Sequence, residues 1–105
     1  MPHPPVVLSD HVVAQLVDLI DRLRDETANC FEQTDDQQQW YNRGYANGIV
    51  LALIELERPD ALVGRSADDA GLIDAAVGLP WGKAYRHGET MGRRETYEIA
   101  GIPSS

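Results

Sequence analysis

The chain has one cysteine, one lysine, few aromatic residues and no long apolar run. A single cysteine, Cys30 among 105 residues, cannot form a disulfide within the chain. No charged segment followed by an apolar segment opens the sequence, so we expect a protein of the reducing cytoplasm. The longest apolar run is IVLALI at 49–54. Since a helix needs roughly 20 apolar residues to cross a bilayer, we expect no membrane partner.

Basic residues are scarce as well. The chain carries 9 Lys and Arg against 17 Asp and Glu, which gives a formal net charge of −8. Such a charge is repelled by phosphate and by anionic lipid, which argues against nucleic acid as a partner. A hydrophobic content of 43% is enough for one small core. We therefore expect a proline-rich arm at 1–8, a single compact domain at 9–102 and a tail at 103–105.

Apolar residues recur at helical spacing through the first half of the chain. Ser9 or Asp10 can cap a helix over about 10–29, whose apolar residues fall on one stripe. The segment TDDQ at 34–37 resembles a capping box and predicts the start of a second helix. The C-terminal half of that helix is apolar on all sides, which indicates burial, and Pro59 ends it.

The second half of the chain is less clear. The segment SADD at 66–69 predicts a short third helix, which Gly78 and Pro80 stop. Residues 81–100 fit a fourth helix, but RRETYEIAGI also alternates as a strand does, so a hairpin at about 83–100 is the alternative. The predicted fold class is mainly α, a small single-domain bundle of three to four helices, with α+β as the alternative.

A pattern of one tyrosine and two glycines occurs twice, in WYNRGYANG at 40–48 and in AYRHGETMG at 84–92, at a constant offset of 44 residues. Each glycine inside a helix costs about 1 kcal/mol relative to alanine, so four of them require a compensating contact. Either the second and fourth helices pack on each other, which we prefer, or one of these faces meets a second copy or another protein. The repeat also suggests duplication of a helical hairpin. The candidate packing or interface residues are Trp40, Tyr41, Gly44, Tyr45, Gly48, Trp81, Tyr85, Gly88 and Gly92.

Two charged faces are further candidates. The outer face of the first helix is acidic and could contact a protein, or it could simply be solvated. The fourth helix carries a basic face opposite its aromatic and glycine stripe, for which we favour pairing within the chain or solvation over contact with phosphates. The acidic candidates are Asp18, Asp21 and Asp25, and the basic candidates are Lys83, Arg86, Arg93 and Arg94.

Catalytic and cofactor motifs are missing from the sequence. There is no HxxxH, CxxC or HExxH spacing for a metal, and no GxGxxG or GxxxxGK[ST] loop for a nucleotide. Cys30 has no basic neighbour that would activate it, so we expect a small buried apolar group. The aspartate pairs at 35–36 and 68–69 are interpreted as helix-start anions. We therefore predict no enzyme and no catalytic, metal-binding or cofactor-binding residues.

The stretches WYNRGYANGI and YRHGETMGRRE look like helices of small accessory proteins from actinobacteria and their bacteriophages. The resemblance implies a cytoplasmic product that binds a host protein or itself. Together with the acidic charge, it leads us to expect a non-catalytic protein-binding accessory or regulatory protein. A homo-oligomeric structural or assembly protein is the second hypothesis. A regulator that contacts nucleic acid through the basic C-terminal face is the third.

Overall fold

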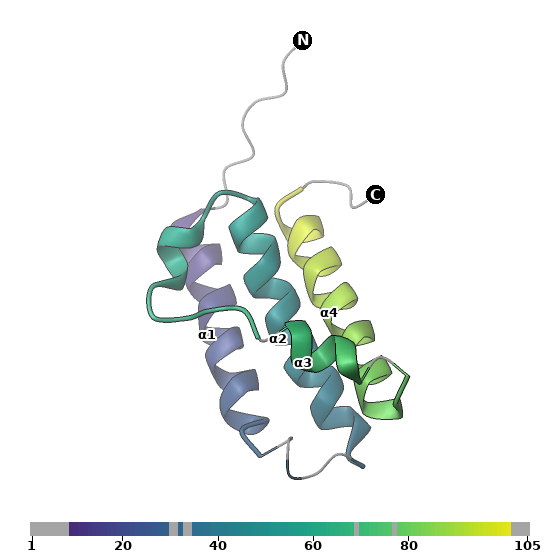
Figure 1. Cartoon of the computed structure of the whole chain (residues 1–105). Coiled ribbons are helices and arrows are strands. Elements are labelled where there is room, and N and C mark those ends of the chain that lie inside the picture. The colour runs from purple at the N-terminus through teal and green to yellow at the C-terminus, as the bar shows by residue number, and fades with distance from the viewer. Residues whose placement is uncertain (1–8, 30–31, 33–34, 69, 77, 102–105) are drawn as a thin grey trace.

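The computed structural model describes residues 9–29, 32, 35–68, 70–76 and 78–101, and within them the chain is helical and has no strand. The predicted mainly α bundle is confirmed, and the C-terminal segment is one helix rather than a hairpin (Figure 1). The predicted arm and tail, together with Cys30, lie outside the described residues. The elements are α1 (Asp10–Glu26), α2 (Gln37–Glu55), the 3-10 helix η2 (Pro59–Leu62), α3 (Ala70–Ala75) and α4 (Pro80–Ile99).

The first two helices begin at side-chain caps. Ser9 caps α1 and its hydroxyl accepts a 3.2 Å hydrogen bond from the backbone N–H of Val12. The cap of α2 is Asp36, whose carboxylate accepts from the backbone N–H of Gln39 at 3.2 Å. This corrects the predicted capping box, whose Thr34 lies outside the described residues. The observed cap thus lies two residues after the predicted one, and the negative charge of this aspartate also interacts favourably with the helix dipole.

Three other boundaries differ from the predicted ones. α1 ends at Glu26 instead of about residue 29, and α2 ends at Glu55, well before the proline at 59. Glu57 adopts a left-handed φ of 62°, which stops further helical hydrogen bonding there. α3 begins at Ala70, later than the SADD segment predicts, and the carboxylate of Asp68 in that segment binds Arg43 of α2.

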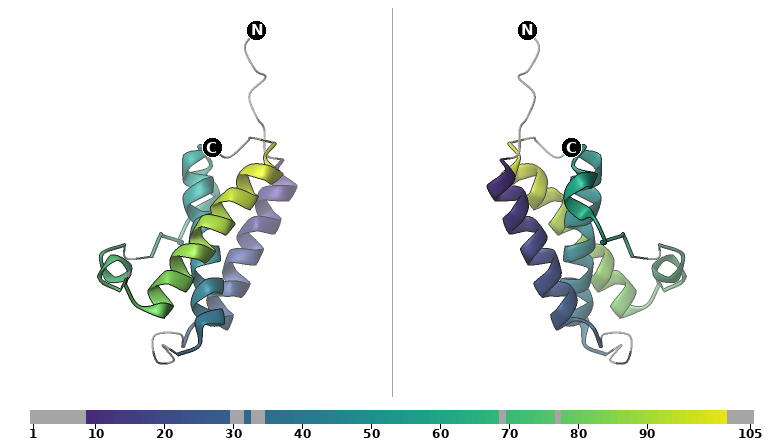
Figure 2. Two further views of the ribbon diagram at one scale, coloured as in Figure 1. Left: turned by 90° about the vertical axis from the view of Figure 1, so that its right-hand side faces the viewer. Right: turned by 90° about the vertical axis from the view of Figure 1, so that its left-hand side faces the viewer.

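The three long helices form two pairs that share α2. α1 packs antiparallel on α2, and α4 packs on α2 in the same direction as α2 (Figure 1). Two parallel neighbours cannot be joined by a tight turn, so the chain returns along the molecule through η2 and α3, and α3 packs on α4. Among the described residues, no Cα of α1 lies within 8 Å of one in α4. Figure 2 shows that α1 and α4 come closest where α1 begins and α4 ends.

The apolar core has two parts. The larger part lies between α1 and α2 and is closed by Leu62 of η2. The smaller part lies between α2, α3 and α4 and centres on Trp40, whose ring centroid is 4.2 Å from that of Trp81. No helix of the described chain is long and apolar enough to cross a membrane. The fully or nearly fully buried members of the larger part are Val13, Leu16, Ile20, Ile49, Val50, Leu53 and Leu62.

Candidate functional site

The backbones of α2 and α4 touch at their glycines. A Cβ atom placed on Gly44 of α2 would lie 1.9 Å from the carbonyl oxygen of Tyr85 on α4. A Cβ placed on Gly88 of α4 would lie 2.0 Å from the carbonyl oxygen of Tyr41 on α2. Real Cβ atoms do not approach an oxygen so closely, so only glycine permits this separation of the two helices.

The next turn repeats the contact. A Cβ on Gly48 would lie 2.1 Å from the carbonyl oxygen of Glu89, and a Cβ on Gly92 would lie 2.2 Å from that of Tyr45. Each contact from α2 to α4 therefore has a counterpart from α4 to α2 at the 44-residue offset of the sequence repeat. All four glycines are buried within one chain, so the glycine stripes face each other and do not face solvent.

The candidate aromatic residues lie around this helix pair. Trp40 and Tyr85 are buried, and Trp81 is partly buried against them, so these rings close one end of the pair. Tyr41 lies between the rings of Tyr45 and His87, with centroids 6.4 and 5.5 Å away. The aromatic candidates thus pack within the bundle, on both sides of the glycine contact.

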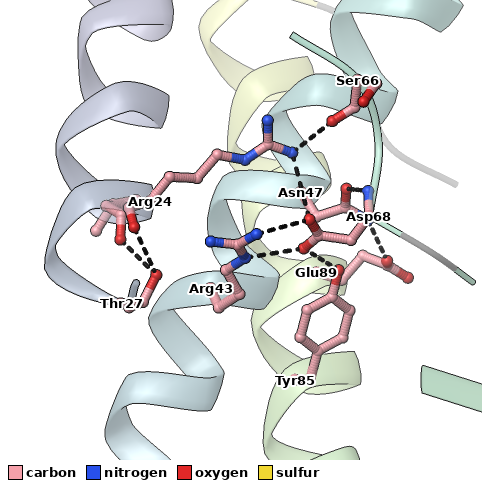
Figure 3. A network of polar contacts seen from close by, with 9 residues as sticks. Arg24, Thr27, Arg43, Asn47, Ser66, Asp68, Tyr85 and Glu89 are labelled. Carbon is pink, nitrogen blue, oxygen red and sulfur yellow. Dashed lines mark hydrogen bonds and ion pairs between the residues drawn. The ribbon is translucent and has the colours of Figure 1, made fainter. Parts of the chain in front are cut away.

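Asp68 is the centre of a polar network that joins the connection after η2 to three helices (Figure 3). Arg43 of α2 donates to both carboxylate oxygens of Asp68 at 3.1 Å. Arg24 of α1 forms an ion pair with the same carboxylate at 3.7 Å and donates to the carbonyl of Ser66 at 2.7 Å. The hydroxyl of Tyr85 donates to Asp68 at 2.8 Å. One carboxylate therefore links α1, α2 and α4.

A cavity of about 120 Å³ lies beside this network and is lined in part by Asn47, Tyr85, Arg86 and Glu89. The amide of Asn47 accepts from the backbone N–H of Asp68 and donates to Glu89, both at 2.8 Å. Arg86 donates to Glu89 at 2.7 Å. The pKa of the Tyr85 hydroxyl is raised far above its usual range, mainly by burial and secondly by the negative charge of Asp68. This hydroxyl therefore remains protonated and acts as a hydrogen-bond donor.

The polar groups around this cavity are hydrogen-bonded to one another. Asp68 and Glu89 each have an arginine partner, and both ends of the Asn47 amide are used. Among the described residues, no three His, Cys, Asp or Glu side chains gather as metal ligands. The network therefore cross-links the fold, and it positions the segment that precedes α3.

The acidic candidates of α1 are partly neutralised by arginines. Asp21 binds Arg65 through two hydrogen bonds of 2.7 Å, and those bonds lower the pKa of Asp21. Asp18 is 3.6 Å from Arg22 on the same helix, and Asp25 is exposed. The three aspartates thus do not form one uniform acidic surface.

Within the described part of the chain, three of the four basic candidates of α4 are paired with acidic residues, and Lys83 is exposed. Arg86 pairs with Glu89 on the same helix and with Asp74 of α3. Arg93 donates to Glu55 of α2 at 2.6 and 3.0 Å, and this hydrogen bonding lowers the pKa of Glu55. Arg94 is 3.3 Å from Glu98. The guanidinium groups of this face therefore hold α4 to its neighbours or pair along α4 itself.

A groove opens between α1 and the C-terminal end of α4, and we call it the α1–α4 groove. Its volume is about 570 Å³. Its α1 side has an apolar stripe at helical spacing, and its α4 side is Ile99, which is 55% exposed. Asp18 and Arg22 supply its charged rim. The residues that line it are Val12, Gln15, Leu16, Asp18, Leu19, Arg22 and Ile99.

A hydrogen bond joins a tyrosine of α2 to a glutamate of α4 that lies one turn before Ile99. Tyr45 of α2 packs against the larger core, and its hydroxyl donates a hydrogen bond to Glu95 of α4. The pKa of the Tyr45 hydroxyl is raised well above its usual range, mainly by burial and secondly by this hydrogen bond. Glu95 is four residues before Ile99, so the two residues lie on the same side of α4.

Sequence reasoning found the glycine contact but missed both the network and the groove. The sequence predicts a helix-start anion at Asp68. It gives no reason to select Arg24, Arg43 or Asn47, since no local pattern links residues that lie up to 44 positions apart. The groove carries a weak signal, because the apolar stripe of α1 continues beyond the positions that α2 covers. Comparison of the chain with protein-family models, with curated proteins and with solved structures finds no match.

Proposed function

We propose that the protein is a non-catalytic binding protein whose protein partner docks in the α1–α4 groove. The observation that carries the proposal is the groove itself. It is an open groove of about 570 Å³ between two helices. Its lining joins an apolar stripe of one helix to an exposed isoleucine of another, and contiguous exposed apolar surface is typical of interaction sites.

The other candidate surfaces support binding less well. The glycine and aromatic faces are buried between α2 and α4, so a partner could reach them only by separating the helices. On the basic face of α4, Arg86, Arg93 and Arg94 have acidic partners within the chain. A phosphate would have to compete with those carboxylates, which weighs against a nucleic-acid regulator.

The test is an affinity capture with a groove variant. The tagged chain is incubated with a nuclease-treated bacterial lysate, for which the sequence resemblance makes an actinobacterium the first choice. Ile99→Asp places a charge in the apolar mouth of the groove and should abolish capture of any specific partner. The matched control is Val63→Asp, because Val63 is 79% exposed and lies on the connection after η2, outside the groove lining.

Circular dichroism and urea denaturation establish that both variants fold. Purified partner protein is then titrated against the wild-type chain and both variants by calorimetry. Binding that survives Val63→Asp and is lost with Ile99→Asp supports the groove. A partner that binds the Ile99→Asp variant as tightly as the wild-type chain would contradict the proposal.

A further inference from the structure

Glu95 differs from the other carboxylates that lie between the helices. Asp68 is paired with Arg24 and Arg43, and Glu89 is paired with Arg86. Glu95 is also partly buried, but its interaction partner is the hydroxyl of Tyr45, and within the described residues no basic side chain lies within 4 Å of it. Among the described residues, Glu95 is therefore a partly buried carboxylate without an ion-pair partner.

Glu95 lies one turn from Ile99, which is exposed to solvent. Ile99 follows it by one turn on the same side of α4 and forms part of the groove lining. Tyr45, its hydrogen-bond donor, packs on the core cluster that contains Leu16, another lining residue. Glu95 itself does not line the groove, so a partner that covered Ile99 and continued one turn along α4 would also remove water from Glu95. Covering such a carboxylate is costly unless the partner supplies a cation.

The shape of the groove decides the form of the partner. Its lining consists of side chains from two helices, and it offers no strand edge to an extended peptide. An extended segment buried there would leave backbone groups without hydrogen bonds, whereas a helix satisfies its own. The lining of α1 runs from Val12 to Arg22, and this length of about 15 Å matches about three turns of a helix.

We infer that the α1–α4 groove receives an amphipathic helix of another protein that carries a lysine or arginine within its apolar face, where the cation pairs with Glu95. This inference rests on the proposed function and names the chemistry of its partner. The net charge of −8 favours a basic segment over a second copy of this chain, which would bring an equal negative charge.

The test uses an unbiased display library of helical peptides, selected on the immobilised wild-type chain. The selected peptides are titrated by fluorescence anisotropy against the wild-type chain and four variants. Ile99→Asp blocks the groove and Val63→Asp is its control. Glu95→Gln removes the charge but keeps an acceptor for Tyr45, and Glu98→Gln removes the same charge from an exposed residue that pairs with Arg94. Circular dichroism establishes that each variant folds.

The inference predicts peptides with leucine-like residues at helical spacing and one basic residue among them. Their affinity should fall about tenfold with Glu95→Gln and change little with Glu98→Gln. At high salt, the difference in affinity between the wild-type chain and the Glu95→Gln variant should become much smaller. Selected peptides that lack an enriched basic position, or that bind the Glu95→Gln variant unchanged, would overturn it. Failure to select any peptide would also overturn it.

Two further results separate this inference from the proposed function. Peptides that are lost with Ile99→Asp but do not respond to Glu95→Gln would contradict the cation while the groove remains a binding site. Peptides that respond to neither substitution would contradict both. Sedimentation equilibrium tests the alternative occupant, because a dimer that Ile99→Asp dissociates would assign the groove to a second copy and overturn the inference.

Discussion

α2 meets its two long neighbours in opposite ways. Toward α1 it presents large apolar side chains, and Ile49, Val50 and Leu53 interdigitate with the stripe of α1. Toward α4 it presents glycines, and the two backbones approach so closely that no Cβ fits at Gly44 or Gly48. The α1–α2 interface therefore consists of packed apolar side chains, whereas the α2–α4 interface consists of backbone contacts at glycines.

The difference has consequences for both packing and surface. A side-chain interface can relax when one methyl group is lost, because neighbouring side chains shift into the space. A backbone interface accommodates an added methyl group only if the two helices move apart, since the opposing atom is a carbonyl oxygen of a rigid helix. The close approach of α4 to α2, without a matching approach to α1, also leaves the α1–α4 groove uncovered.

The largest effect is expected from adding one methyl group at the glycine contact. Gly44→Ala should lower the free energy of unfolding by about 3 kcal/mol, even though alanine favours a helix by about 1 kcal/mol. The reason is the carbonyl of Tyr85, which would lie 1.9 Å from the new Cβ. Urea denaturation followed by circular dichroism measures the change.

The matched control is Gly78→Ala. Gly78 lies in the turn before α4, and a Cβ there would have no atom within 4 Å. The free energy of unfolding of the Gly78→Ala variant should equal that of the wild-type chain or exceed it by up to about 1 kcal/mol, because alanine restricts the unfolded chain. The double variant Gly44→Ala/Gly88→Ala should cost less than the sum of its parts, since one separation of the helices relieves both contacts. A Gly44→Ala variant as stable as the wild-type chain would contradict the backbone interface.

The next effect concerns the network that ties α1 to the helix pair. Asp68→Asn should lower the free energy of unfolding by about 2 kcal/mol, because Arg24 and Arg43 would keep their burial and lose their counter-charge. Asp74→Asn removes an exposed partner of Arg86 and should cost less than about 0.5 kcal/mol. Equal costs, measured by the same denaturation, would show that the network adds nothing beyond a surface ion pair.

A smaller effect is expected from removing one methyl group at the side-chain interface. Ile20 of α1 is fully buried between α1 and α2. Ile20→Val should lower the free energy of unfolding by about 1 kcal/mol, since it removes apolar contact and leaves a small gap. If Ile20→Val lowered the free energy of unfolding as much as Gly44→Ala does, the proposed difference between the side-chain interface and the backbone interface would be contradicted.

The smallest effect depends on pH. The hydrogen bond from Arg93 lowers the pKa of Glu55 in the folded chain. This pairing therefore stabilises the fold above the unfolded pKa of about 4.3, and the stabilisation is lost as the pH falls through the lowered folded value. Glu55→Gln should be slightly less stable than the wild-type chain at pH 7, and the two curves should converge on acidification.

The control for the pH series is Glu57→Gln, which changes an exposed glutamate next to the end of α2. The stability of this variant is measured from pH 7 to pH 3 under the same conditions. A constant gap between Glu55→Gln and the wild-type chain over the same range would show that the Arg93 contact is not linked to the titration of Glu55.

The helices could be predicted because their signals are local. Apolar spacing and Ser9 located α1, and the repeated tyrosine and glycine pattern favoured a helix over a hairpin for α4. The pattern also predicted a contact between α2 and α4, since glycine in a helix requires a reason. It could not give the direction of the pair, which depends on the long connection between them.

The remaining features depend on tertiary distances. Gly82 was not singled out, yet a Cβ there would lie 1.9 Å from the carbonyl oxygen of Ala76. The role of Asp68 depends on arginines from α1 and α2, which the sequence does not place next to it. The α1–α4 groove exists because α1 and α4 do not pack on each other, and the apolar stripe of α1 gives only a weak local indication of it.

The most direct test of the binding proposal is an NMR titration of the ¹⁵N-labelled chain with the peptide that binds it most tightly. The account predicts that the largest shift changes fall on Val12, Leu19, Glu95 and Ile99, and that Ile99→Asp abolishes them. Changes centred instead on the outer face of α1 at Asp25, or on the basic face of α4 at Lys83, would contradict the groove as the binding site.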